Sequence, residues 1–190
     1  MSFDILIAGV GGQGTILTSR LLAEAAVQAG RFVRTGETIG MSQRGGCVVS
    51  HVRIDSREES PYIPLGKADL ILAFEMAEAA RNLDRLKPDG KIIVSAQKLE
   101  PVTVTLGGMA YDEETIRETL SDAIFIDGYG AAEQAGNVKA VNVVLLGAAL
   151  GAGLLPFSAE ELKRAIDIQV PERFRELNYK ALELGCDYVK

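Results

Sequence analysis

Short apolar runs alternate with helical patterns along the first third of the chain. The apolar run Phe3–Val10 leads into glycines and predicts a strand buried on both faces. Apolar side chains then recur near helical spacing over residues 14–29, and Gly30 is placed to end that helix. Residues 31–34 predict a short second strand. Residues 35–46, rich in Gly, Ser and Thr, predict a loop too long to be a simple connection.

The alternation continues through the middle of the chain. The β-branched run Cys47–Ile54 predicts a strand, and a polar loop follows it. Beyond that loop we expect strands over residues 68–74, 91–95, 102–106 and 123–127, helices over 75–86 and 112–120, and a turn over 87–90. Alternating strands and helices predict an α/β protein: a Rossmann-like, mostly parallel twisted sheet with helices on both faces, in a single domain over residues 1–190.

The last third is helical in pattern. Residues 141–157 carry no charge, and their apolar part is shorter than the roughly 20 residues of a membrane span, which favours a buried helix. Gly147 and Gly151 lie four residues apart, so that another element can approach that face closely. Ser158 and Glu161 have the spacing of a capping box. A last helix is expected to begin near Pro171 and to end near residue 185.

The composition and net charge of the chain argue against several classes of partner and cofactor. The 190 residues are 47% hydrophobic, with a mean hydropathy of +0.13, a formal net charge of −6 and a pI near 4.9. An acidic chain without basic runs argues against nucleic acid and anionic membranes. The sequence begins without a signal peptide, so we expect a cytoplasmic protein with reduced thiols and Cys47 as a small buried hydrophobe. One His and two Cys cannot hold a structural zinc or an iron–sulfur cluster, so any redox centre must lie in another chain.

A glycine turn joins the first strand to the first helix. Gly9, Gly11 and Gly14 match the G-x-G-x-x-G spacing, in which glycines permit a tight turn, close approach of a phosphate, and close packing of the helix on the strand. The helix N-terminus adds free N–H groups and partial positive charge. The turn therefore predicts a small-anion or phosphate site, although the glycines alone are equally needed for a tight strand-to-helix turn.

A nicotinamide dinucleotide fits this turn poorly. Such sites place an acidic residue about 20 positions on, at the end of the second strand. Here that stretch carries Arg34, which would suit a 2′-phosphate, and the first acid, Glu37, comes only in the following loop, where it would contact a ribose or pair with Arg34.

Other polar residues keep two interpretations each. Arg44, beside Gly45, places a planar donor fork next to accessible backbone, or else forms a surface ion pair in an ordinary loop. His51, in a strand without a nearby Cys or carboxylate, is more often structural than a general acid or base. Residues 127–130, at a strand end where open sheets bind ligands, include Tyr129 and are equally a simple turn.

Several segments together resemble one family. Residues 11–14 (Gly-Gly-Gln-Gly), 41–46 (Met-Ser-Gln-Arg-Gly-Gly), 48–53, 60–64 and 170–172 resemble the γ-type subunit of 2-oxoacid:ferredoxin oxidoreductases. The Met-Ser-Gln-Arg-Gly-Gly form is most similar to the small (β) subunit of indolepyruvate ferredoxin oxidoreductases, with the pyruvate and 2-oxoglutarate γ subunits as alternatives. The resemblance covers nearly the whole chain.

The resemblance implies a non-catalytic subunit of a larger enzyme. That enzyme oxidatively decarboxylates a 2-oxoacid to an acyl-CoA, with thiamine diphosphate and [4Fe-4S] clusters in a larger partner chain and ferredoxin as acceptor. The chain fits that role in lacking a thiamine diphosphate motif and a cysteine cluster. It would have no catalytic residue, no metal and no activity alone, and its self-association as a homo-oligomer stays open. The residues that the resemblance and the turn chemistry assign to coenzyme A are Gly9, Gly11, Gly12, Gln13, Gly14, Glu37, Arg44 and Gly45.

Two other functions remain open at this point. The first is a free-standing NAD(P)-dependent oxidoreductase that uses the same glycine turn. The second is an assembly protein in which the glycines serve packing alone.

Overall fold

The computed structural model describes residues 2–40, 46–58, 60–98 and 111–189. Its strands are β1 (Phe3–Val10), β2 (Val33–Ile39), β3 (Cys47–Ile54), β4 (Ala68–Ala73), β5 (Leu86–Ser95) and β6 (Ile124–Ile126). Its helices are α1 (Thr15–Gln28), α2 (Met76–Arg81), α4 (Glu113–Thr119), α5 (Gly128–Ala135), α6 (Val141–Gly151), α7 (Ala159–Gln169) and α8 (Arg175–Tyr188). Three short 3₁₀ turns are η1 (Leu83–Arg85), η2 (Val138–Ala140) and η3 (Glu172–Phe174).

The six strands form one sheet in the order β2-β3-β1-β4-β5-β6. The pairs β1–β4, β4–β5 and β5–β6 are parallel, whereas β3 is antiparallel to both of its neighbours. Five strands therefore point the same way and one is reversed. The predicted α/β class is confirmed, with a mixed sheet in which β3 separates β2 from β1.

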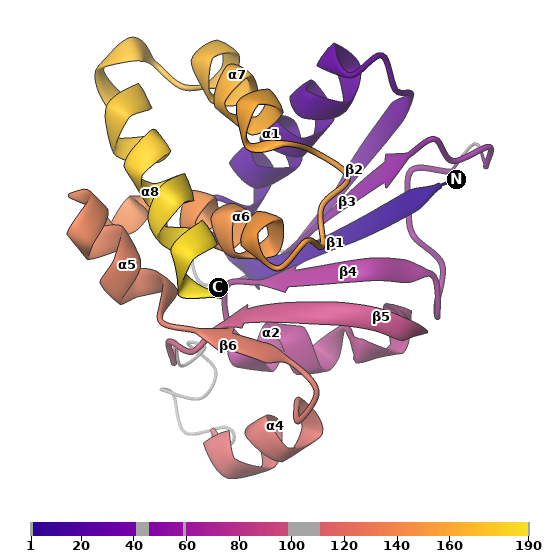
Figure 1. Cartoon of the computed structure of the whole chain (residues 1–190). Coiled ribbons are helices and arrows are strands. Elements are labelled where there is room, and N and C mark those ends of the chain that lie inside the picture. The colour runs from indigo at the N-terminus through magenta and orange to yellow at the C-terminus, as the bar shows by residue number, and fades with distance from the viewer. Residues whose placement is uncertain (1, 41–45, 59, 99–110, 190) are drawn as a thin grey trace.

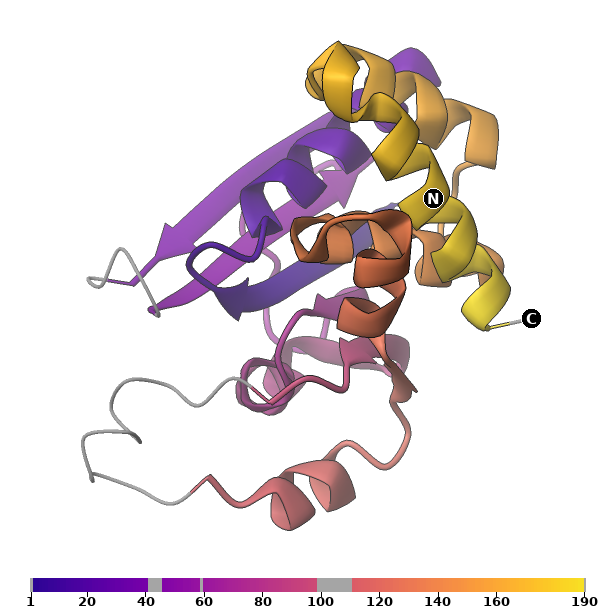
Figure 2. The ribbon, with the colours of Figure 1, turned by 90° about the vertical axis from the view of Figure 1, so that its left-hand side faces the viewer.

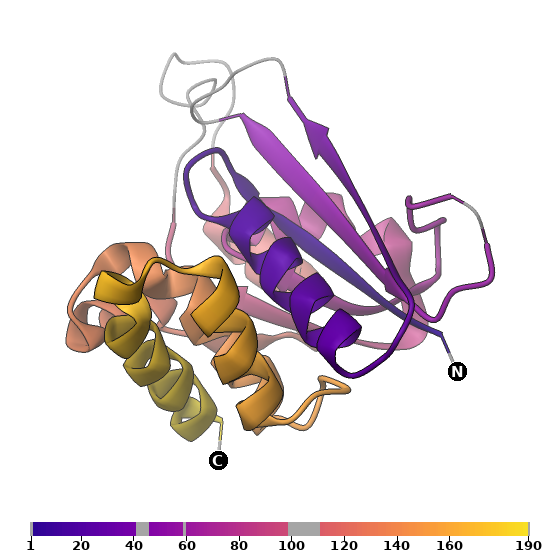
Figure 3. The same cartoon turned by 90° about the horizontal axis from the view of Figure 1, so that it is seen from above.

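Helices cover both faces of the sheet, as predicted (Figure 1). On one face Ile5 and Ile7 pack in a core with α1 and α6, and on the other Leu6 and Ala8 pack in a core with α2. Figure 3 shows α1 in indigo across the sheet, with the C-terminal helices beside it in orange and yellow. There α7 packs against α1, and α8 against α6.

The observed element boundaries differ most from the predicted ones where a strand is polar. Residues 35–39 were expected in a loop, but they belong to β2, which pairs with β3 from Val33 to Ile39. The extent of this edge strand is set by its backbone pairing with β3. Most of its side chains are at least partly exposed, so its sequence shows no hydrophobic pattern. The predicted helix over 75–86 is also wrong beyond Arg81, where α2 ends and η1 follows.

The turn expected over residues 87–90 lies inside β5 instead. The pairing of β4 with β5 jumps from Ala68–Leu86 to Leu70–Lys91, so the extra residues of β5 bulge out of the ladder. The strand expected over residues 102–106 lies outside the described residues.

The C-terminal helices confirm the capping and close-packing predictions. Ser158 and Glu161 form both bonds of a capping box at the start of α7. A Cβ on Gly147 would lie 2.1 Å from the Leu182 carbonyl oxygen, so α6 and α8 touch backbone to backbone. The expected helix end at Gly185 is wrong: this residue lies within α8, where a Cβ would lie 2.1 Å from the Val144 oxygen. None of the helices in the described ranges is long and apolar enough to cross a bilayer.

Candidate functional site

The glycine turn lies at the carboxyl end of β1, between Val10 and the first residue of α1 (Figure 2). Gly12 and Gly14 have φ angles of 103° and 88°, the left-handed region that favours glycine. A Cβ on Gly14 would also lie 3.1 Å from the amide nitrogen of Asn142. Gly14 therefore permits close packing against the start of α6, rather than the helix-on-strand packing that its motif position suggested.

The N–H groups of the turn divide into bonded and unbonded ones. The N–H of Gly11 donates to the Gly46 carbonyl at 2.9 Å, and that of Gln13 to the Val10 carbonyl at 3.2 Å. Within the described part of the chain, the N–H groups of Gly12 and Gly14 have no hydrogen-bond acceptor. The first N–H groups of α1 have no partner within the helix either. This arrangement can bind a small anion.

The side chain of Gln13 fixes the turn to its neighbours. Its Oε1 accepts from the Val10 N–H at 2.8 Å. Its Nε2 donates to the Phe74 carbonyl at 3.1 Å and to the Tyr129 hydroxyl at 2.9 Å. Gln13 is buried, so its amide holds the ends of β1 and β4 and the start of α5 together. The turn expected around Tyr129 is thus the first turn of α5, with Asp127 as its N-cap.

Sequence reasoning missed a buried acid beside this turn. Glu75, two residues after the end of β4, is fully buried and caps α2 by accepting from the Glu78 N–H at 3.0 Å. The Tyr111 hydroxyl also donates to its carboxylate. Burial and this bond to Glu75 raise the pKa of Tyr111, so the phenol stays protonated. The available signal was an acidic residue at the carboxyl end of a buried strand, where open sheets bind ligands.

The structure separates Arg34 from the glycine turn. Arg34 on β2 lies opposite Arg53 on β3, and Arg53 in turn lies opposite Asp4 on β1. Gly9 is five residues further along β1, about 17 Å at 3.3 Å per residue. The Arg34 guanidinium instead donates to the carbonyls of Ser56 and Glu58, at 3.3 and 2.7 Å. A 2′-phosphate at the turn would therefore lie far from Arg34.

Glu37 lies closer, on β2 beside α1. Its carboxylate accepts from the Ser19 hydroxyl at 3.3 Å, and β3 stands between its strand and β1. Arg44 and Gly45 lie outside the described residues, although Gly46, which follows them, is bonded to the turn. Cys47 is exposed at the start of β3, which corrects the expectation of a small buried hydrophobe. As the first residue of the strand after residues 41–46, it lies beyond the packed part of β3.

His51 is buried on the face opposite α1 and 2% exposed. Its Nδ1 accepts from the Ile63 N–H at 3.2 Å, and its ring makes an edge contact with Tyr62. Burial lowers the pKa of His51 to about 4, with a smaller contribution from the charges of Arg85 and Arg53. A neutral, hydrogen-bonded histidine supports the structural interpretation.

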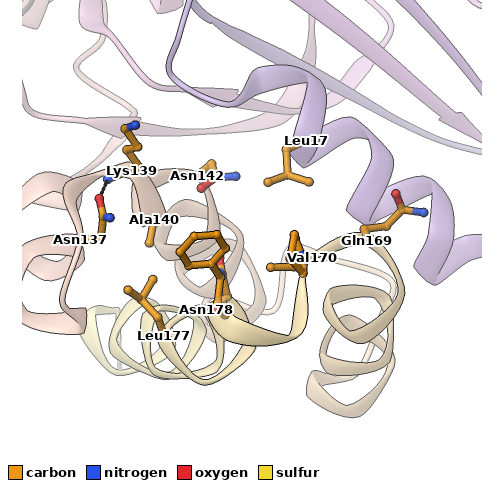
Figure 4. Close-up of a pocket in the computed structure, with 11 residues that line it drawn as sticks. Leu17, Asn137, Lys139, Ala140, Asn142, Gln169, Val170, Leu177 and Asn178 are labelled. Carbon is orange, nitrogen blue, oxygen red and sulfur yellow. Dashed lines mark hydrogen bonds between the residues drawn. The ribbon is translucent and has the colours of Figure 1, made fainter.

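A cavity of about 230 Å³ adjoins the turn on its α6 side (Figure 4). Its residues come from α1, η2, α6, the end of α7, η3 and α8: Leu17, Asn137, Lys139, Ala140, Asn142, Gln169, Val170, Pro171, Phe174, Leu177 and Asn178. Asn142 is 2% exposed, and its side-chain amide forms no hydrogen bond to a described residue. Among the described residues, the fully buried side-chain atoms without a hydrogen-bond partner are the hydroxyl oxygens of Ser50 and Ser95, and the Asn142 amide is not one of them. It therefore stays accessible from the cavity that it lines, where water or a ligand can pair with it.

The pyruvate ferredoxin/flavodoxin oxidoreductase family model matches residues 4–188. Indolepyruvate oxidoreductase subunit IorB of Pyrococcus horikoshii is 39% identical, over 99% of this chain and 96% of its own length. The IorB subunit of Archaeoglobus fulgidus is 40% identical, over 97% of this chain and 94% of its own. Among solved structures, the γ subunit of a keto/oxoacid ferredoxin oxidoreductase from Geobacter sulfurreducens matches with a TM-score of 0.72 and 28% identity, covering 98% of both chains. The chain therefore belongs to the pyruvate ferredoxin/flavodoxin oxidoreductase family and is a small subunit of a 2-oxoacid ferredoxin oxidoreductase.

Proposed function

We propose that this chain is the small subunit of an indolepyruvate ferredoxin oxidoreductase and forms part of the coenzyme A side of that assembly. The two IorB relatives support the choice of indolepyruvate, because they are 39% and 40% identical to this chain, whereas the pyruvate synthase subunit PorC of Methanocaldococcus jannaschii is 27% identical over a similar length. In this proposal thiamine diphosphate and the [4Fe-4S] clusters belong to a larger partner chain, through which electrons reach ferredoxin. The two cysteines of this sequence are fewer than the four that a cluster takes.

One observation carries the coenzyme A role: the N–H groups of Gly12 and Gly14 are unbonded within the described residues and lie at the N-terminus of α1. Coenzyme A carries phosphates, which such N–H groups bind well. Gln13 and Gly11, whose polar groups are engaged with the protein, would hold the shape of the turn. Arg44 would supply a charged fork two residues before Gly46, whose carbonyl is bonded to the turn.

The test is steady-state kinetics of the complex of this chain with its larger partner. Loss of a charged hydrogen bond costs about 1.5–3 kcal/mol. Arg44→Ala should therefore raise the KM for coenzyme A by about 10-fold or more, because each 1.4 kcal/mol is tenfold. The KM for the 2-oxoacid should stay unchanged.

Arg57→Ala is the matched control. Arg57 is exposed in the loop after β3, at the opposite end of the sheet from the glycine turn. Its removal should leave the KM for coenzyme A unchanged. An intact complex in which Arg44→Ala also has the wild-type KM for coenzyme A would contradict the proposed contact.

A further inference from the structure

The cavity beside the glycine turn has mostly apolar walls and a polar edge (Figure 4). Leu17 of α1, Val170 after α7 and Leu177 of α8 supply aliphatic surface, and Phe174 supplies a ring. A volume of about 230 Å³ is below the range of sites for drug-sized ligands. The cavity is therefore sized for one ring system rather than for a whole nucleotide.

Two carboxamides form the polar edge. Asn142 is 2% exposed and has no hydrogen-bond partner among the described residues, so both its donor and its acceptor are available. Asn178 is 7% exposed, and its Nδ2 donates to the Phe174 carbonyl at 2.7 Å. That bond orients the Asn178 amide and leaves its Oδ1 as an acceptor. The edge thus offers a donor beside acceptors.

We infer that this cavity binds a flat heteroaromatic ring whose edge presents a donor beside an acceptor, the chemistry of adenine. An Asn carboxamide pairs with adenine through two hydrogen bonds, to its N6 and N7. An aromatic side chain such as Phe174 stacks on the face of such a ring. Aliphatic walls alone would accept any apolar group, but they leave the Asn142 amide unpaired.

The surroundings of the ring suit the rest of a nucleotide. Asn142 lies against Gly14, whose missing Cβ would stand 3.1 Å from the Asn142 amide nitrogen. The ring would therefore lie next to the first turn of α1, where N–H groups favour a phosphate. Lys139, exposed on the rim of the cavity, forms no ion pair with a described residue and adds positive charge.

Adenine has two sources, a free adenine nucleotide and coenzyme A. If the source is coenzyme A, the inference rests on the proposed function and extends it to the base end of the ligand. If it is a free nucleotide, the cavity is a separate site. The chemistry of the cavity is the same in both cases.

Calorimetric titration of the complex of this chain with its larger partner tests the inference, with adenosine, AMP, guanosine and coenzyme A as probes. Asn142→Leu keeps the volume of the side chain and removes its hydrogen bonds. Binding of adenosine and AMP should weaken at least 10-fold in this variant, and guanosine should bind poorly to the wild type. Gln134→Leu, the same chemical change on an exposed residue of α5 away from the cavity, should bind like the wild type.

Competition then identifies the source. Displacement of adenosine by coenzyme A, with a matching loss of coenzyme A affinity in Asn142→Leu, assigns the site to coenzyme A. Adenosine and AMP binding that coenzyme A does not displace assigns it to free nucleotides. No binding of adenosine to the wild type, or equal binding to Asn142→Leu, overturns the inference and leaves a cavity that holds water alone. Because Arg44→Ala reports on the phosphate side of the site, the two proposals can fail independently.

Discussion

At the scale of single residues, buried polar side chains hold the end of the sheet in place. Gln13 joins the ends of β1 and β4 to Tyr129, and Glu75 receives the Tyr111 hydroxyl while capping α2. The bonds of Gln13 position the glycine turn, so the N–H groups of Gly12 and Gly14 are held in a fixed arrangement. Sequence spacing found the turn, but it could not show that Gln13 points inward, because side-chain direction depends on strands far apart in the chain.

His51 gives a prediction for pH dependence. The folded chain keeps His51 neutral with a pKa of about 4, whereas the unfolded chain protonates it near 6.5. The unfolded state therefore binds more protons below pH 6.5, and stability falls as pH drops from 6.5 to about 4. The difference of about 2.5 pH units corresponds to about 3 kcal/mol.

The measurement is denaturant unfolding of the wild type and of His51→Gln between pH 7 and pH 4. Gln has an acceptor for the Ile63 N–H but no titrating group, so its stability advantage relative to the wild type should grow by about 3 kcal/mol toward pH 4. Parallel stability curves for the two proteins would show that His51 is not a buried neutral group.

At the scale of elements, α6 and α8 pack with their backbones in contact. Gly147→Ala in an ordinary helix would stabilise it by about 0.5–1 kcal/mol. Here the new Cβ would lie 2.1 Å from the Leu182 carbonyl oxygen, and backbone cannot yield as a side chain does. We expect a loss of about 1–3 kcal/mol, measured as a lower midpoint of denaturant unfolding. An unfolding midpoint of Gly147→Ala at or above that of the wild type would contradict the close packing.

The elements also show what sequence patterns can predict. Apolar runs predicted β1 and β3 at their observed bounds, because six of the eight residues in each strand are buried. The spacing of Gly147 and Gly151 indicated a close approach, and α8 is the element that approaches. The edge strand β2 and the bulged start of β5 were missed, because their conformation is set by pairing with a neighbouring strand rather than by a local pattern.

At the scale of the whole molecule, the order of the strands in the sheet determines which residues lie near the glycine turn. Because β3 lies between β1 and β2, Arg34 and Glu37 stand on a strand that is not next to β1, where a dinucleotide-binding unit has its acidic residue. No motif in the sequence indicates that β3 lies between β1 and β2. The likeness in residues 11–14 and 41–46 predicted the family, which the relatives confirm, but the cavity at Asn142 has no sequence signal of its own.

We propose that the reaction needs this chain even though the thiamine diphosphate and the iron–sulfur clusters belong to the partner chain. The direct test is indolepyruvate-dependent reduction of ferredoxin and formation of acyl-CoA by the larger partner chain, titrated with this chain. We expect neither chain to form acyl-CoA alone, and activity to rise with added chain until it saturates at a fixed ratio. Full acyl-CoA formation by the partner alone, with the same KM for coenzyme A, would contradict this role of the chain.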